Sequence, residues 1–164
     1  MARSKIKHFK GFSIVDGDIR VTLNMNRFER QFQRAQYQLD GAVMNSMVPF
    51  MPMVTGSFIN ATRAASAAVQ GSGEVYAAYG PQGRFLYEGK TMVDEKTGST
   101  WARRGAKKVL VSEFGGKTNA KPDLTYTRQA HPKAQAHWFD TANKKDGKKW
   151  VRGVKETAGG GWRG

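Results

Sequence analysis

The stretch Met47-Val48-Pro49-Phe50-Met51-Pro52-Met53-Val54-Thr55-Gly56-Ser57 separates two segments that have helical patterns. Pro49 disfavours helical geometry at the preceding Val48, so we expect the first helix to end there. Thr55 or Ser57 can cap the second helix, over 57–65. Before the break, small and apolar side chains recur at alternating steps of four and three, which places them on one helix stripe that we interpret as core: Phe28, Phe32, Ala35, Leu39, Ala42 and Ser46.

Two short runs of β-forming residues precede the first helix, at 12–15 and 19–23. They flank Asp16-Gly17-Asp18. Because Asp-Gly marks a tight turn, this region predicts a short strand pair or one bent strand. Asn26 followed by Glu29 has the form of a capping box, which places the start of the long helix here.

The region after the second helix begins with Gly71-Ser72-Gly73, which lies between β-compatible runs at 67–70 and 74–79 and predicts a hairpin. Pro81 suits the first turn of a short helix through Phe85-Leu86-Tyr87. Gly89 suits the end of that helix, because glycine readily adopts a left-handed backbone.

Weaker patterns follow in the last part of the chain. Residues 91–108 and 115–122 are polar and glycine-containing, and we interpret them as flexible loops before and after a strand at 108–111. A further strand is predicted at 124–128. Beyond Pro132, a last helix has Ala134, Trp138 and Phe139 available for packing and continues past Trp150.

These patterns predict an α+β fold, with a long N-terminal helix and shorter helices packed on a small, mostly antiparallel sheet, with extended arms and loops. We divide the chain into a basic N-terminal arm at 1–10, a single α+β domain at 11–157 and a flexible Gly-rich C-terminal tail at 158–164. A chain of 164 residues that is 39% hydrophobic is long and apolar enough to bury a core.

Composition excludes several classes of protein. The chain contains no cysteine, so disulfides, thiolate nucleophiles and the usual zinc clusters are absent. No stretch approaches the roughly 20 apolar residues that span a bilayer, and no apolar segment of a secretory signal follows the N-terminal lysines. We therefore expect a soluble protein that makes no membrane contact.

The net charge of +14 is unevenly distributed. Residues 1–95 contain 11 basic and 8 acidic side chains, whereas residues 96–164 contain 16 basic and 5 acidic side chains. The positive charge of the second half suits phosphate groups of DNA, acidic protein neighbours or simply solvent. No known nucleic-acid-binding module surrounds it, so composition alone leaves these alternatives open.

Groups suited to catalysis are few. The histidines are His8, His131 and His137, and the six-residue spacing of the last two does not bring two imidazoles to one metal on a helix. Asp16-Gly17-Asp18 lacks the regularly spaced oxygen ligands and the final glutamate of a calcium-binding loop. We therefore expect no enzyme, with no catalytic, cofactor-binding or metal-binding residues and no cofactor.

The order of these elements resembles that of the minor capsid, head-tail joining and tail-completion proteins of long-tailed bacteriophages. The resemblance covers roughly residues 20–155. It rests on the first helix at 28–47, the proline and Thr-Gly break at 49–56, the second helix at 57–65 and the hairpin at 67–79. An aromatic segment at 84–90 follows, and then a Trp-aromatic-acid element at 136–142 that leads into a lysine-rich helix. The basic arm and the Gly-rich tail are not part of this pattern.

The resemblance implies a structural virion protein of the phage neck, made in the host cytoplasm and located at the head-tail interface. It implies a homo-oligomeric, hexameric ring that contacts connector, adaptor or stopper proteins on one side and tail terminator or tail-tube proteins on the other. Genomic double-stranded DNA in the lumen would touch it without sequence specificity. The alternative from another class is a basic DNA-binding or packaging accessory protein.

Two groups of residues are candidates for contacts. For subunits or partner proteins we predict residues in the break and in the polar loops, because exposed methionines adapt to irregular surfaces: Met51, Pro52, Met53, Trp101, Arg103, Arg104 and Lys117. For DNA or an acidic partner we predict the paired lysines near the C-terminus: Lys144, Lys145, Lys148 and Lys149.

Overall fold

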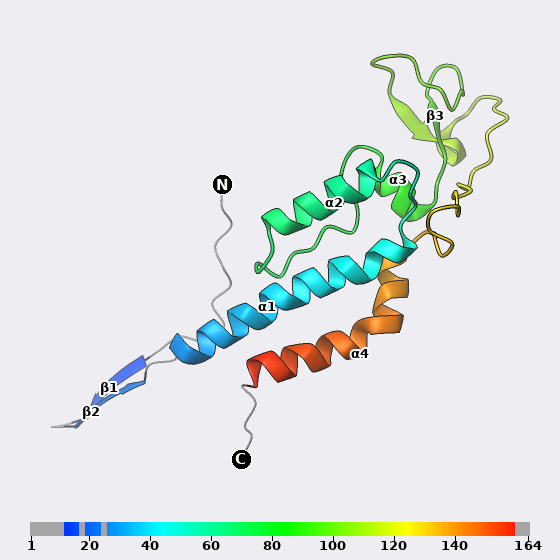
Figure 1. Ribbon diagram of the computed structural model, residues 1–164. Coiled ribbons are helices and arrows are strands. Elements are labelled where there is room, and N and C mark those ends of the chain that lie inside the picture. Colours follow the sequence, from blue (N-terminus) through cyan, green and yellow to red (C-terminus); the bar gives the residue numbers. More distant parts are fainter. Residues whose placement is uncertain (1–11, 17–18, 24–25, 160–164) are drawn as a thin grey trace. The chain divides into compact units, whose positions relative to one another are not determined.

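The computed structural model describes residues 12–16, 19–23 and 26–159, and its fold is α+β, as predicted (Figure 1). In chain order the elements are β1 (Phe12–Asp16), β2 (Ile19–Leu23), α1 (Asn26–Met47), η1 (Val48–Phe50), α2 (Ser57–Ala68), α3 (Gly83–Glu88), β3 (Met92–Asp94), β4 (Lys108–Leu110), η2 (Val111–Glu113) and α4 (Trp138–Ala158). The described strands form two separate antiparallel pairs, β1 with β2 and β3 with β4.

The chain is organised in two compact units. The first consists of the residues up to Ser46, Arg63–Tyr76 and the residues from Ala142 onward, and the second consists of Met47–Thr62 and Ala77–Thr141. The proposed arm at 1–10 lies outside the described residues, as do residues 160–164 of the proposed tail. Ala158, with which that tail was predicted to begin, is the buried last residue of α4.

The predicted strand pair at the start of the chain is confirmed. β1 and β2 pair in a register that runs from Phe12 opposite Leu23 to Asp16 opposite Ile19. The two turn residues at 17–18 lie outside the described part of the chain.

In the first unit, α1 lies between the second half of α2 and α4 (Figure 1). Arg63 of α2 donates a hydrogen bond to the amide oxygen of Asn45 at 2.8 Å. On the other side, Thr157 of α4 donates to the amide oxygen of Gln38 at 2.6 Å. The predicted core stripe of α1 is only partly confirmed, because Ala35 is buried whereas Phe28 is 48% exposed.

The hairpin predicted at 67–79 is wrong. α2 continues to Ala68, and the following segment forms an irregular loop whose backbone groups bind side chains instead of a neighbouring strand. The carboxylate of Asp40, which is 4% exposed, accepts hydrogen bonds from the backbone N–H groups of Gly71 at 2.7 Å and Gly73 at 3.2 Å. The Ser66 hydroxyl bonds both the N–H and the carbonyl of Tyr76. These side chains satisfy backbone groups that a strand ladder would otherwise satisfy.

The helix break is confirmed. Pro49 lies in the 3-10 turn η1, which follows directly after α1, and the chain leaves this turn extended at Met51. α2 then begins at Ser57. Phe50 and Met51 on either side of this exit are buried, so the connection contributes to the core of the second unit.

Trp138 forms the centre of that core and is fully buried. Its indole N–H donates to the carbonyl of Ala77 at 2.8 Å, and its ring meets Phe58 and Tyr87 edge to face, with centroids 5.9 and 4.9 Å apart. The indole therefore combines a large apolar contact area with a satisfied polar group, which is the arrangement that stabilises a buried tryptophan.

Sequence patterns were less successful around β3 and β4. β4 at 108–110 and the short helix α3, which ends at the left-handed Gly89, are confirmed. Residues 91–108 contain β3, which was not predicted. The strand predicted at 124–128 is wrong. The bridge between Lys90 and Asp123 ends before it, and the hydroxyl of Tyr126 instead binds the carbonyl of Leu86 at the end of α3.

Candidate interaction surfaces

The loop between β3 and β4, residues 95–107, is organised by Asp94. This carboxylate is fully buried and accepts hydrogen bonds from the backbone N–H groups of Lys96 at 2.8 Å, Thr97 at 3.2 Å and Arg103 at 3.4 Å. The guanidinium of Arg103 adds an ion pair, with Nε 3.2 Å and Nη2 3.3 Å from the carboxylate oxygens. One side chain therefore holds both ends of the loop, and we call this group of contacts the Asp94 clasp.

The charge of Asp94 is stabilised by these contacts. The Arg103 guanidinium, followed by the backbone N–H groups, holds the pKa of this carboxyl far below its ordinary value, although burial acts in the opposite direction. Asp94 is consequently a carboxylate at any pH near neutrality. Because its oxygens are already engaged by N–H donors, its role is to position the loop.

Close packing at Gly98 adds to the rigidity of the loop. Gly98 has a left-handed backbone with φ of +67°, and a Cβ atom at this position would lie 2.5 Å from the ring of Phe114. The Thr118 hydroxyl donates to the Gly98 carbonyl at 2.7 Å. The loop is thus anchored at Gly98 on the segment that follows β4.

Trp101 lies at the tip of this ordered loop, and its side chain is 89% exposed. Among the described residues it is the most exposed large apolar side chain. The nearby cations differ in availability. Arg103 is committed to Asp94, Lys107 lies 3.8 Å from Glu95, and the ammonium of Lys108 donates to the carbonyl of Thr100. Lys96 and Arg104 have exposed side chains without a recorded partner in the described part of the chain, and we call Trp101, Lys96 and Arg104 the loop tip.

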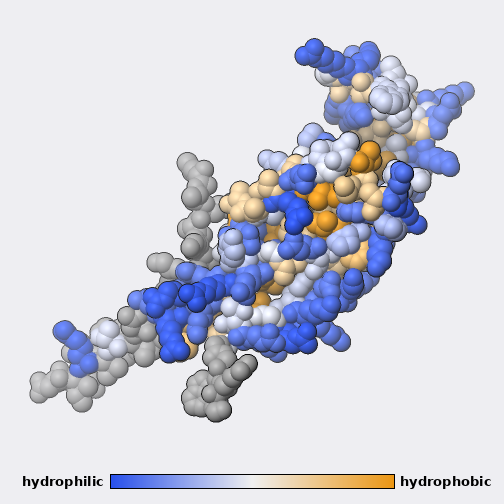
Figure 2. All heavy atoms as spheres, viewed as in Figure 1, coloured by the Kyte–Doolittle hydropathy of each residue, from blue (hydrophilic) through white to orange (hydrophobic). Residues whose placement is uncertain are grey.

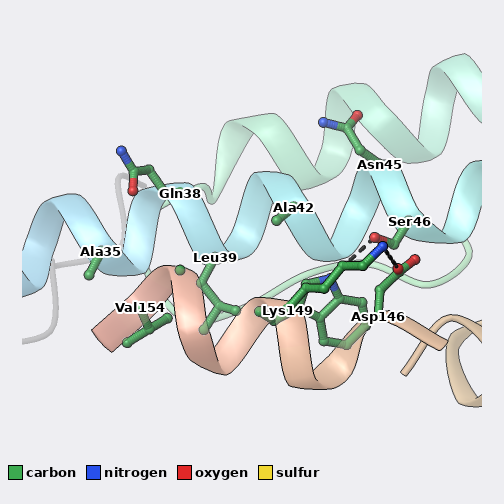
Figure 3. A pocket seen from close by; sticks show the side chains of 11 residues that line it. Ala35, Gln38, Leu39, Ala42, Asn45, Ser46, Asp146, Lys149 and Val154 are labelled. Atoms are coloured by element: carbon green, nitrogen blue, oxygen red, sulfur yellow. Dashed lines mark hydrogen bonds and ion pairs between the residues drawn. The ribbon is translucent and has the colours of Figure 1, made fainter. Parts of the chain in front are cut away.

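A groove runs between α1 and α4 in the first unit, with a cavity volume of about 510 Å³. Figure 3 shows Leu39 and Val154 facing each other across it, and Trp150 donates to the Ser46 hydroxyl at its end. Asp146 and Lys149 form an ion pair of 3.1 Å on its rim. Four residues of the predicted stripe of α1 therefore line this groove, which is open because small side chains form part of its walls: Ala35, Leu39, Ala42 and Ser46.

The lysines predicted as a contact surface lie on α4, whose visible side is largely hydrophilic (Figure 2). Lys144, Lys145, Lys148 and Lys149 are all exposed. Arg152 and Lys155 continue this basic surface, and acidic side chains within the same helix neutralise part of it. Asp146 pairs with Lys149 and Glu156 lies 3.9 Å from Arg152.

The predicted contacts in the helix break need one correction. Met51 is fully buried, so the expectation that it is exposed to a partner is wrong: its side chain belongs to the core of the second unit. Pro52 and Met53 are half-buried. Lys117 is exposed in the segment that binds Gly98, and it borders a polar hollow with Thr118 and Asn119.

The two histidines in the described part of the chain have different surroundings. Nδ1 of His131 donates a hydrogen bond to the carbonyl of Met51 at 2.8 Å, whereas His137 lies 3.6 Å from Glu88 and 3.8 Å from Asp140 at the start of α4. Within residues 12–16, 19–23 and 26–159, no group of three or more His, Asp or Glu side chains is arranged to hold a metal ion. No helix in the same part of the chain is long and apolar enough to cross a membrane.

Comparisons with protein-family models, with curated proteins and with solved structures find no match to this chain. Its function must therefore be argued from the surfaces described above.

Sequence reasoning found Trp101, Arg103 and Arg104 but missed the residue that organises them. Asp94 belongs to neither of the two groups of residues predicted to make contacts. The run Asp94-Glu95-Lys96-Thr97-Gly98 contained the signal, because an aspartate followed by polar residues and a glycine commonly caps its own turn through backbone N–H groups.

Proposed function

We propose that this chain is a structural protein of the neck of a long-tailed bacteriophage particle, where copies of it join the head to the tail. The observation that carries the proposal is the use of its buried carboxylates. Asp40 and Asp94 both bind backbone N–H groups and shape loops, whereas Trp101, the most exposed large apolar side chain in the described part of the chain, is presented by one of those loops. Such an arrangement suits a protein whose function is to bind other proteins.

The order of elements also supports a neck protein. The elements follow the order on which the resemblance rests. They are the long α1, the break at Pro49, α2, the short α3 that ends at Gly89 and the lysine-rich α4 that begins at Trp138. The irregular loop at 69–79 departs from that pattern, since the pattern has a hairpin there. A homo-oligomeric ring, with connector or stopper proteins and tail proteins as neighbours, is part of this proposal.

The test is the composition and shape of particles. Virions purified from a phage that encodes the chain should contain it at the head-tail junction, detected by mass spectrometry and by gold-labelled antibody in electron micrographs. A phage with an early stop codon in the gene should accumulate separate filled heads and separate tails. Virions that lack the chain, or normal joining in the stop-codon phage, would exclude this function.

A second candidate, a basic DNA-binding or packaging accessory protein, is favoured by one specific observation. The cations Lys144, Lys148 and Lys155 are exposed on α4 and have no recorded partner in the described part of the chain. If this candidate is correct, the isolated protein should retard duplex DNA in a gel, and affinity should fall steeply with salt concentration because released counterions drive the association. Reversal of Lys144 and Lys148 to glutamate should then abolish the shift.

A further inference from the structure

We propose that the loop tip docks onto a different virion protein, which presents an apolar socket for Trp101 surrounded by acidic side chains. This inference rests on the proposed function, and it names the chemistry of one neighbour. The loop tip consists of Trp101, Lys96 and Arg104, as defined above.

The first step is that the tip is presented in a fixed shape. The Asp94 clasp joins residues 96, 97 and 103, and the backbone N–H of Trp101 donates to the Ser99 hydroxyl at 3.1 Å. The carbonyl of Ser99 in turn accepts the N–H of Asp94 at 2.8 Å. A loop that is ordered before it binds loses less conformational entropy on association, so its exposed side chain can contribute more to affinity.

The second step is the chemistry of the tip. Tryptophan and arginine are the residue types most enriched among those that dominate the affinity of protein interfaces. A central aromatic side chain with a polar rim is also the usual arrangement of such interfaces. Trp101 supplies the aromatic side chain, and the same loop contains Lys96 and Arg104, which border one hollow. These two cations call for carboxylates on the partner.

The third step excludes DNA as the occupant of this surface. Affinity for duplex DNA grows with the number of phosphates neutralised, and the loop has only two cations without a recorded partner. Binding of single strands uses several aromatic side chains that stack on successive bases. Trp101 is the only aromatic residue of the loop at 95–107. The next aromatic residue along the chain, Phe114, is packed against Gly98 and does not offer its ring to a base.

The fourth step excludes a second copy of the chain. Each copy contains 27 basic but only 13 acidic side chains, so a second copy offers few carboxylates to the loop tip, whichever other surfaces join copies in a ring. Many acidic side chains of the described residues are also engaged within the chain already: Asp40, Asp94, Glu95, Asp123, Asp146 and Glu156. The partner is therefore a protein with a more acidic surface.

The experiment uses particles assembled without this chain, to which the purified full-length protein is added. Binding is measured by co-sedimentation over a range of protein concentrations. Trp101→Ala should weaken binding by about tenfold or more, as expected for an aromatic anchor. Val54→Ala is the matched control, because Val54 is 81% exposed and lies outside the loop, and it should bind like the wild type.

A charge comparison tests the acidic rim. The double variant Lys96→Glu and Arg104→Glu should bind more weakly than the wild type. The double variant Arg128→Glu and Lys133→Glu changes the net charge equally at exposed positions outside the loop and should bind normally. Circular dichroism and thermal unfolding should be unchanged for Trp101→Ala, since that side chain has little contact to lose.

A photo-crosslinker placed at Thr100, which leaves Trp101 intact, identifies the partner by mass spectrometry. The expected product joins residue 100 to a peptide of another virion protein that contains Asp or Glu. A crosslink to DNA or to a second copy of the chain would overturn the inference, as would equal binding by Trp101→Ala and Val54→Ala. Those outcomes leave the neck function standing, whereas a wild-type protein that binds no particle excludes both.

Discussion

The indole N–H of Trp150 donates a hydrogen bond to the hydroxyl oxygen of Ser46 at 3.2 Å, and this contact joins helices α4 and α1 across a sequence separation of 104 residues. Ser46→Ala removes the acceptor from a part-buried donor. We expect the free energy of unfolding to fall by about 1 kcal/mol, the usual net contribution of such a bond. Urea denaturation measures it. Ser112→Ala, at an exposed serine without a recorded hydrogen bond, should change stability by much less, and equal losses would contradict the prediction.

Asp40 should contribute strongly to the stability of the first unit. Asp40→Ala leaves the N–H groups of Gly71 and Gly73 without their carboxylate acceptor, and it also removes a bond from the amide of Gln36. Hydrogen bonds to a charged group are the stronger kind, so we expect a loss of about 2 kcal/mol or more in urea denaturation. Asp123→Ala provides the control, because that carboxylate is 71% exposed and its ion pair with Lys90 should contribute less than about 1 kcal/mol.

The Asp94 clasp should depend on pH in one direction only. The folded protein lowers the pKa of Asp94, whereas the unfolded chain has an ordinary aspartate with a pKa of about 3.9. The clasp therefore contributes fully to stability above about pH 4, and its contribution is lost as the pH falls below that value toward the lowered pKa of the folded protein. Hydrogen exchange at residues 96, 97 and 103, corrected for intrinsic rates, should show constant protection from pH 7 to pH 5.

The variant Asp94→Asn tests the same clasp at neutral pH. The neutral amide weakens the ion pair with Arg103 and turns an NH2 group toward N–H donors, so exchange at residues 96, 97 and 103 should accelerate. Glu113→Gln, at an exposed carboxylate outside the loop, should leave these amides unchanged. Unaltered protection in Asp94→Asn would show that other contacts hold the loop.

Two glycines should respond to alanine in opposite directions. Gly153 lies inside α4 and a Cβ atom there would meet no atom within 4 Å, so Gly153→Ala should stabilise the protein by roughly 0.5–1 kcal/mol through helix propensity. Gly98→Ala should destabilise the β3–β4 loop, because its φ is +67° and the added Cβ would lie 2.5 Å from the Phe114 ring. Thermal unfolding of both variants measures the contrast. Destabilisation by Gly153→Ala would show that α4 needs the space.

Sequence patterns predicted the elements whose boundaries depend on local chemistry. The break at Pro49 follows from proline geometry, and the end of α3 at Gly89 follows from a left-handed glycine. The pairing of β1 with β2 was indicated by the Asp-Gly pair in the sequence between them. The failures at 67–79 and 124–128 have another cause. At 67–79 the backbone binds side chains that are distant in sequence, such as Asp40. At 124–128 the N–H of Leu124 and the hydroxyl of Tyr126 bind carbonyls of α3 and its C-terminal end, so no local pattern indicates either structure.

The candidate surfaces were predictable to a similar extent. Trp101 could be found because a tryptophan within a polar, glycine-containing segment has little chance of burial. The burial of Met51 could not be found, because it depends on the tertiary packing around the helix break and not on the neighbouring residues. The groove lined by the stripe of α1 likewise required α4, which lies far away in sequence.

The Asp94 clasp has a consequence for how this protein can change over generations. The residues that set the shape of the loop, Asp94 and Gly98, differ from the residue that forms most of its apolar surface, Trp101. Mutations at position 101 can therefore alter what the loop recognises while the scaffold beneath it persists. A descendant of this chain that meets a new binding partner can adapt to it by replacing a few side chains, without the need to evolve a new fold.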